Sequence, residues 1–140
     1  MHEYGIAKEV LRVIEAHLAS YENSKPISCT LKVGALSGIN PEALEAAIPM
    51  AVKGTVAEGV EFKVSVDPVS CKCRNCGANI ELDEFVDMLV CESCGSQDIE
   101  CPEDASKVLI QGLELEKDGR RLVVEMEGAE VEEEEHGHEH

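Results

Sequence analysis

The stretch C-K-C-R-N-C-G at residues 71–77 and the stretch C-E-S-C-G at residues 91–95 together organise this 140-residue chain. Each contains a Cys-x2-Cys pair followed by glycine. Two intervening residues let both sulfurs of a pair face one ion, and the glycine permits the tight turn that aims backbone amides at the sulfurs. Four thiolates in a tetrahedron suit Zn²⁺ and leave no open position for substrate. The spacing therefore predicts a structural zinc site with four ligands: Cys73, Cys76, Cys91 and Cys94.

The chain has seven cysteines, and the other three receive different interpretations. Cys71 and Cys101 flank the paired cysteines and could substitute as ligands or bind a second ion. Because Cys71-x-Cys73 lacks the two-residue spacing, we interpret both as non-ligands. Cys29 falls on the apolar side of an alternating segment, which predicts a buried and unreactive thiol. Iron could occupy the same four thiolates, as in rubredoxins, which would make the protein a red electron carrier.

Upstream of the cysteines, the chain opens with an amphipathic pattern. Apolar residues recur at steps of three and four over residues 6–21, which predicts a helix that ends near residues 22–24. His17 lies at the edge of the apolar stripe, and we interpret it as structural. Residues 27–33 then alternate between apolar and polar, as in a half-buried strand.

A second helix is predicted from Asn40 onward. Asparagine is a good N-cap, and Pro41 is tolerated at the first helical position. Pro49 removes one backbone donor, so we expect a kink or early termination there. Gly54 is a suitable stop signal for the helix.

Further strands lie on both sides of the cysteine segment. Residues 60–66 alternate until Pro68, and residues 108–115 and 121–124 form two strands joined by a turn at Asp118-Gly119. We predict an α+β fold, with two helices packed on a small mixed β-sheet. A zinc-ribbon-like module inserted between two strands should project from one edge.

Charge and composition exclude several classes of protein. The net charge is −17, and residues 125–140 hold eight acids without Lys or Arg. Such a chain repels phosphate backbones and attracts cations and basic protein surfaces, so nucleic acid is not an expected partner. A zinc-ribbon adaptor in nucleic-acid machinery would need a basic, aromatic face, and the chain has only two Tyr and two Phe. The chain has neither a transmembrane pattern nor a signal-peptide pattern, so we expect a cytoplasmic protein without membrane contact. In the reducing cytoplasm, closely spaced cysteines more often bind metal than form disulfides.

Both chain ends carry histidines that could chelate a transition metal. The bulk of His2 predicts that Met1 is retained, so a free α-amine precedes an imidazole by one residue. The amine, the deprotonated His2 amide and the imidazole can close fused chelate rings in one plane, which suits Ni²⁺ or Cu²⁺ better than Zn²⁺. The other histidines lie in the acidic tail, where weak auxiliary metal binding is compatible with disorder: His136, His138 and His140.

Four motifs together resemble the HypA/HybF family of nickel metallochaperones. They are M-H-E-Y-G-I-A at the start, N-P-E-A-L at residues 40–44, E-G-V-E-F at residues 58–62, and the paired C-x2-C-G motifs. The resemblance covers about residues 1–116. It implies a protein that delivers Ni(II) during maturation of [NiFe] hydrogenase, and in some organisms urease. It also implies two partners, a HypB-like nickel-binding GTPase and the precursor of the hydrogenase large subunit, and it leaves a homodimer open.

The resemblance carries site residues over by position. The nickel-binding histidine corresponds to His2, with the Met1 amine nearby and Glu3 modulating the site, while the four paired cysteines correspond to the zinc ligands. With the pattern of elements and the acidic tail, this predicts three parts: a nickel-binding α/β domain (residues 1–67 and 105–125), a zinc-binding module (residues 68–104) and a disordered acidic and histidine-rich tail (residues 126–140). Pro49, the flanking cysteines and the tail depart from the family pattern. With no nucleophile–base pair and no phosphate-binding glycine loop, we expect a carrier and not an enzyme.

Overall fold

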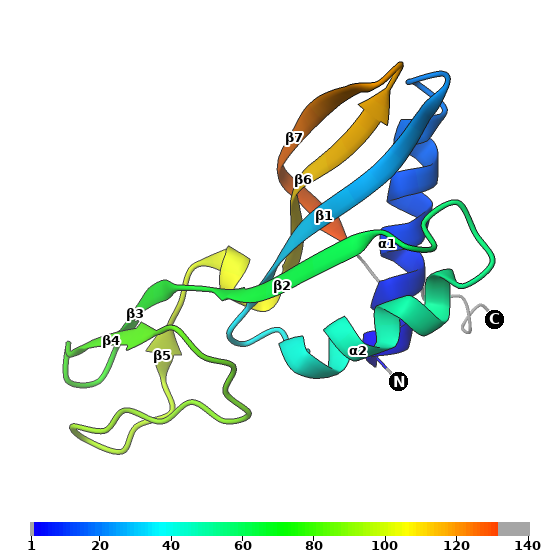
Figure 1. The fold of residues 1–140 in the computed structure, drawn as a ribbon. Helices are drawn as coiled ribbons and strands as arrows, with labels where there is room; N and C mark the ends of the chain where they lie inside the picture. Colours follow the sequence, from blue (N-terminus) through cyan, green and yellow to red (C-terminus); the bar gives the residue numbers. More distant parts are fainter. Residues whose placement is uncertain (1, 132–140) are drawn as a thin grey trace, which may run out of the picture.

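The computed structural model describes residues 2–131 and contains two separate β-sheets (Figure 1). The larger sheet has the strand order β2-β1-β6-β7. Strand β1 pairs in parallel with β2, whereas β6 is antiparallel to both β1 and β7, so the sheet is mixed, as predicted. The bounds of its strands are β1 (Ser24–Gly34), β2 (Glu61–Asp67), β6 (Val108–Lys117) and β7 (Arg120–Val131).

Two helices, α1 (His2–Leu18) and α2 (Pro41–Val52), pack against this sheet (Figure 1). Alternation along β1 buries Cys29, Leu31 and Val33. They share one apolar cluster with buried residues of α1 and α2. The parallel strands β1 and β2 are joined by a crossover that contains α2, as parallel pairs require. The predicted α+β architecture is confirmed.

Helix α1 ends at Leu18, so the predicted end near residues 22–24 was wrong. The chain turns over residues 19–23, with Asn23 in the left-handed conformation (φ 61°). This reversal lets β1 begin at Ser24, where it pairs with Lys117 of β6. The apolar periodicity predicted that the helix would reach residues 22–24, but pairing with β6 places Ser24 in strand β1 instead.

Helix α2 begins as predicted, because the Asn40 side chain accepts hydrogen bonds from the backbone N–H groups of Glu42 (2.9 Å) and Ala43 (3.2 Å). The helix does not terminate at Pro49 but continues to Val52. Burial of Ile48 and of the last turn outweighs the lost backbone donor, and Pro49 itself is exposed. Gly54, with φ +79°, follows the helix as predicted.

The second sheet belongs to a module inserted between β2 and β6 (Figure 1). Its strand order is β4-β3-β5, and a 3₁₀ helix leads back to β6. Both ends of the insertion meet the same end of β1, where Gly34 pairs with Asp67 and Val33 pairs with Val108. The module therefore projects from one end of the larger sheet. Its elements are β3 (Val69–Cys73), β4 (Asn79–Leu82), β5 (Ile99–Glu100) and η1 (Glu103–Ser106).

Close backbone contact joins the module to the larger sheet. The Gly34 N–H donates to the Lys107 carbonyl (2.7 Å), and the Leu36 N–H donates to the Ala105 carbonyl (2.8 Å). A Cβ on Gly34 would lie 2.2 Å from the Ala105 oxygen, so only glycine allows this approach. On the other side, the Val86 N–H donates to the Ala35 carbonyl (3.1 Å).

Strand β7 is longer than predicted. It runs to Val131 instead of ending near residue 124, and Met126 and Val131 are buried in the larger core. Residues 126–131, which the sequence had placed in the acidic tail, therefore belong to the sheet. The histidines of residues 136–140 lie outside the described residues. Within the described part of the chain, no helix is long and apolar enough to cross a membrane.

Candidate metal centres

The first cysteine pair sits at the end of β3, in a tight turn. The Cys73 N–H donates to the Ala78 carbonyl (2.9 Å), and the Gly77 N–H donates back to the Cys73 carbonyl (2.9 Å). Gly77 has φ +79°, a left-handed conformation that favours glycine. The turn brings Cys73 and Cys76 to one side of the chain, as the sequence predicted.

The second pair repeats this local structure outside any strand. The Cys91 N–H donates to the Ser96 carbonyl (2.9 Å), and the Gly95 N–H donates to the Cys91 carbonyl (2.7 Å). Gly95 again has φ +79°. Two copies of one turn therefore face each other across the module.

The four predicted zinc ligands come together. Their sulfurs all lie within 4.8 Å of one another. The Sγ atoms of Cys73 and Cys94 are 3.7 Å apart, and those of Cys76 and Cys91 are 3.6 Å apart. Zinc–sulfur bonds of about 2.3 Å in a tetrahedron require sulfurs separated by about 3.8 Å. The thiols present thus fit a tetrahedral zinc ion.

Hydrogen bonds to the sulfurs tune the site. The Asn75 side-chain amide lies 3.4 Å from the Cys94 sulfur and lowers the pKa of that thiol. The Cys94 backbone amide lowers the pKa of Cys91. At Cys76 the Ala78 amide also lowers the pKa, but the Cys91 sulfur and burial oppose it and leave the pKa at about 12. Four sulfurs so close repel one another as thiolates, and a divalent cation removes that repulsion.

An exposed arginine connects the two ends of the module. The Arg74 guanidinium lies 3.0 Å from the Asp98 carboxylate and 3.8 Å from the Glu100 carboxylate. The backbone N–H of Arg74 also donates to the backbone carbonyl of Asp98 (2.9 Å). Exposed pairs contribute only about 0–1 kcal/mol each. The contact orients β5 against the first turn, and the sequence analysis missed it.

The two flanking cysteines form a disulfide. Cys71 and Cys101 are bonded, with Cα atoms 4.4 Å apart, and neither belongs to the four-sulfur cluster. Strands β3 and β5 bring them together, because Lys72 pairs with Glu100 and the next positions face each other. The interpretation as non-ligands agrees with this geometry, but the bond was not predicted. Their position at the two ends of the module was the available signal.

At the other candidate site, His2 is the first residue of α1. Met1 and the His2 side chain lie outside the described residues, so the nickel ligands stay a prediction. The Glu3 carboxylate accepts a hydrogen bond from the Asn40 N–H (3.3 Å), which places the start of α1 beside the N-cap of α2.

Two further residues behave as the sequence predicted. The His17 ring nitrogen lies 3.1 Å from the Val13 carbonyl of its own helix, which is a structural contact. Cys29 is fully buried, and burial raises the pKa of its thiol to about 12, so this cysteine stays protonated and unreactive at neutral pH.

Comparisons with known proteins identify the family to which this chain is similar. The family model described as "Hydrogenase/urease nickel incorporation, metallochaperone, hypA" matches residues 1–115. The hydrogenase maturation factor HypA of Aquifex aeolicus is 33% identical over 119 residues, covering 84% of this chain and 100% of that protein. The corresponding factor of Desulfitobacterium hafniense is 31% identical over 117 residues, with coverages of 84% and 100%.

Two solved structures share the fold. The solution structure of the Ni metallochaperone HypA from Helicobacter pylori has a TM-score of 0.52 at 17% identity, covering 79% of this chain and 94% of that one. A second solution structure, of HypA protein, has a TM-score of 0.53 at 20% identity, with coverages of 81% and 94%. At these identities the likeness confirms the arrangement of helices and sheets.

Proposed function

This chain belongs to the HypA family of nickel metallochaperones for hydrogenase maturation, and from that premise we propose that it delivers Ni(II) to a [NiFe] hydrogenase, with urease as a second client. The single observation that carries this proposal is the match of residues 1–115, which includes both the N-terminal M-H-E and the paired cysteines. A metallochaperone transfers its metal unchanged to a client. The chain is therefore a carrier and not an enzyme.

The proposed nickel ligands are the Met1 amine together with the amide and imidazole nitrogens of His2. The start of α1 at His2 supports this set, because the first N–H groups of a helix have no acceptor within it. The His2 amide can therefore lose its proton to nickel without breaking a helical hydrogen bond. Glu3, whose carboxylate is bonded to the Asn40 N–H, acts as a positioning residue that holds this end of α1 against α2.

The proposed resident metal is zinc, held by the four paired cysteines. The sulfur separations of 3.6 and 3.7 Å support it. A closed tetrathiolate shell retains its ion, whereas a site at the chain end can surrender nickel to the ligands of a partner. On this division, residues 1–67 and 105–131 form the domain that binds nickel at its first residues, and residues 68–104 form the zinc module.

The proposed partners are a HypB-like nickel-binding GTPase, which would supply GTP hydrolysis, and the precursor of the hydrogenase large subunit. We place the exchange in the cytoplasm, without nucleic acid or membrane. The net charge of −17 supports partners that present basic surfaces.

Nickel calorimetry tests the N-terminal site. The chain is loaded with zinc and truncated after Val131, which removes the tail histidines, and is compared with its His2→Ala and Glu3→Gln variants. Loss of a residue that only hydrogen-bonds a metal ligand already weakens metal binding about 10–100-fold. We therefore expect His2→Ala, which removes a proposed ligand, to weaken nickel binding at least that much. Glu3→Gln should weaken it less. His17→Gln is the matched control and should bind as the parent does. Unchanged stoichiometry and affinity in His2→Ala would refute the site.

Metal analysis of the purified chain tests the zinc assignment separately. We expect about one tightly held zinc per chain in a colourless protein. A red protein with iron in the four thiolates would instead indicate a rubredoxin-like electron carrier.

A further inference from the structure

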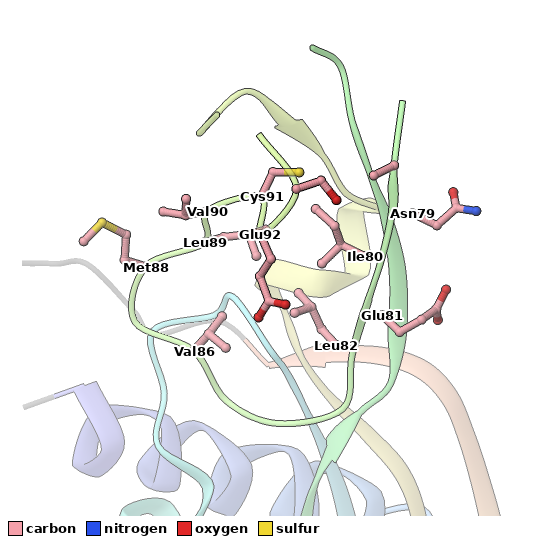
Figure 2. A pocket seen from close by; sticks show the side chains of 12 residues that line it. Asn79, Ile80, Glu81, Leu82, Val86, Met88, Leu89, Val90, Cys91 and Glu92 are labelled. Carbon is pink, nitrogen blue, oxygen red and sulfur yellow. The ribbon is translucent and has the colours of Figure 1, made fainter. Parts of the chain in front are cut away.

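A groove lies within the zinc module. It encloses about 360 Å³ between strand β4 and residues 86–93. Figure 2 shows Ile80 and Leu82 pointing from β4 toward the facing segment, whereas Asn79 and Glu81 point away from it. The other wall is also largely apolar, and it leads directly to a zinc ligand: Val86, Met88, Leu89, Val90 and Cys91.

Two carboxylate residues, Glu81 and Glu92, line this groove of mixed polar and apolar character, and the exposed Glu92 reaches between its walls. Figure 2 shows the Glu92 side chain extending between the walls, with its carboxylate beside Leu82 and Val86. Among the described residues, Glu92 has no ion pair or side-chain hydrogen bond. Residues 78–93 contain five acids and no Lys or Arg, so no cation of this segment can neutralise it. The groove therefore favours an occupant that brings a positive charge.

The rim of the groove exposes large apolar side chains. Met88 is 68% exposed and Val90 is 39% exposed, although both line the cavity. An amide hydrogen bond from Gln97 to the Met88 sulfur (3.6 Å) orients the Met88 side chain. Exposed apolar side chains gathered beside a groove are a feature of surfaces that bind other proteins.

Strand β4 adds a means of recognising an extended chain. It is an edge strand of the small sheet, paired with β3 only. Because the Cys73 N–H bonds the Ala78 carbonyl, the antiparallel alternation directs the backbone groups of Asn79 and Glu81 away from β3. An extended peptide can pair with such groups while its alternate side chains enter the adjoining groove.

We propose that this groove binds an extended segment of a partner protein in which a Lys or Arg is flanked by apolar residues. The cation bonds the Glu92 carboxylate, and its aliphatic stem lies on Ile80 and Leu82. The flanking apolar residues cover Met88 and Val90. Binding requires the folded zinc module but none of the N-terminal nickel ligands, so the inference stands apart from the proposed nickel delivery.

Fluorescence anisotropy of the full zinc-loaded chain with labelled Val-Thr-Arg-Thr-Val tests the groove, since this peptide places valines and arginine on one face when extended. We expect Glu92→Gln to weaken binding about two- to fivefold, the scale of an exposed ion pair. Glu84→Gln removes the same charge from an exposed position outside the groove and should change affinity less than about twofold. A peptide with neutral citrulline in place of arginine should bind the parent as weakly as the arginine peptide binds Glu92→Gln.

A second pair of variants tests the apolar rim. Met88→Ser should weaken binding about threefold, whereas Met50→Ser, at a position that is 74% exposed on α2, should leave binding unchanged. Amide shifts in the NMR spectrum should map to residues 79–82 and 88–93, and His2→Ala should bind the peptide normally. Equal weakening by Glu92→Gln and Glu84→Gln would overturn the proposal, as would absence of peptide binding. Equally tight binding of arginine amide alone would show that the site takes a free cation and not a peptide.

Discussion

The two parts of this molecule are held together by different forces. The larger sheet and its helices bury a continuous cluster of Val, Ile, Leu and Ala side chains. The zinc module has short strands, and the apolar cluster beside it has three buried members: Cys71 and Leu82 of the module and Ala35, which follows β1. Burial at about 25 cal/mol per Å² stabilises the first part, but the second cannot bury enough apolar surface. Four thiols and one disulfide take the place of an apolar core there.

Loss of a proposed zinc ligand should have the largest effect, and it should fall on the zinc module. Cys91→Ser removes a buried thiolate, and structural zinc contributes about 10–16 kcal/mol to modules of this kind. We expect the bound zinc to fall from about one per chain to none, and the amide signals of residues 69–107 to lose their dispersion. The signals of the larger sheet should persist, because its core does not include the cysteine cluster.

The exposed Ser93 provides the control for this experiment. Ser93 lies between Cys91 and Cys94 in the sequence. The variant Ser93→Ala should keep its bound zinc and the dispersion of its amide signals. A module that stays well dispersed and protected from hydrogen exchange without metal would show that the disulfide and the small core suffice.

A truncation in the larger core should have the next largest effect, on the other part of the molecule. Ile110 is fully buried on β6, so Ile110→Ala should lower the free energy of unfolding by about 2–5 kcal/mol. The chain's two tyrosines, Tyr4 and Tyr21, belong to α1 and the turn after it, so tyrosine fluorescence in urea reports this part alone.

Zinc release in the same titration separates the two parts. A chromophoric chelator measures how tightly each variant holds zinc. At urea concentrations below the tyrosine transition, Ile110→Ala should hold zinc about as tightly as the parent chain. Val123→Ala, at a position that is 62% exposed on β7, should cost less than about 1 kcal/mol. If Ile110→Ala released zinc in the absence of tyrosine unfolding, the two parts would not be independently stabilised.

The fold was predictable from the sequence where local patterns decide it. Alternation in β1 and the Asn40 cap were confirmed because each depends on residues within a few positions of one another. The errors lie where distant pairing decides the boundary. Strand β6 pairs with Ser24 of β1 at one end and with Val131 of β7 at the other. Neither pairing follows from a hydrophobic period in the local sequence.

The same contrast applies to the candidate sites. The spacing of the paired cysteines specifies a turn and hence a ligand set, so the sequence identified all four members of the cluster. The bond between Cys71 and Cys101 depends on the pairing of β3 with β5, and the contact of Glu3 with Asn40 depends on how α1 meets α2. Tertiary structure creates these contacts between residues 30 and 37 positions apart, which short-range spacing does not encode.

The junction between the two parts should show the smallest effect. At Gly34 a new Cβ would lie 2.2 Å from the Ala105 oxygen, so Gly34→Ala must displace η1 and should cost about 1–3 kcal/mol. Gly112→Ala is the matched control, because its Cβ would meet only the Val124 oxygen at 3.8 Å, and it should be neutral or stabilising by up to about 1 kcal/mol. Urea unfolding gives both values, and hydrogen exchange at Leu36 reports the bond to Ala105. Faster exchange at Leu36 in Gly34→Ala, with zinc retained, would locate the damage at the junction. Equal stability of the two variants would mean that the close approach of β1 and η1 does not couple the two parts.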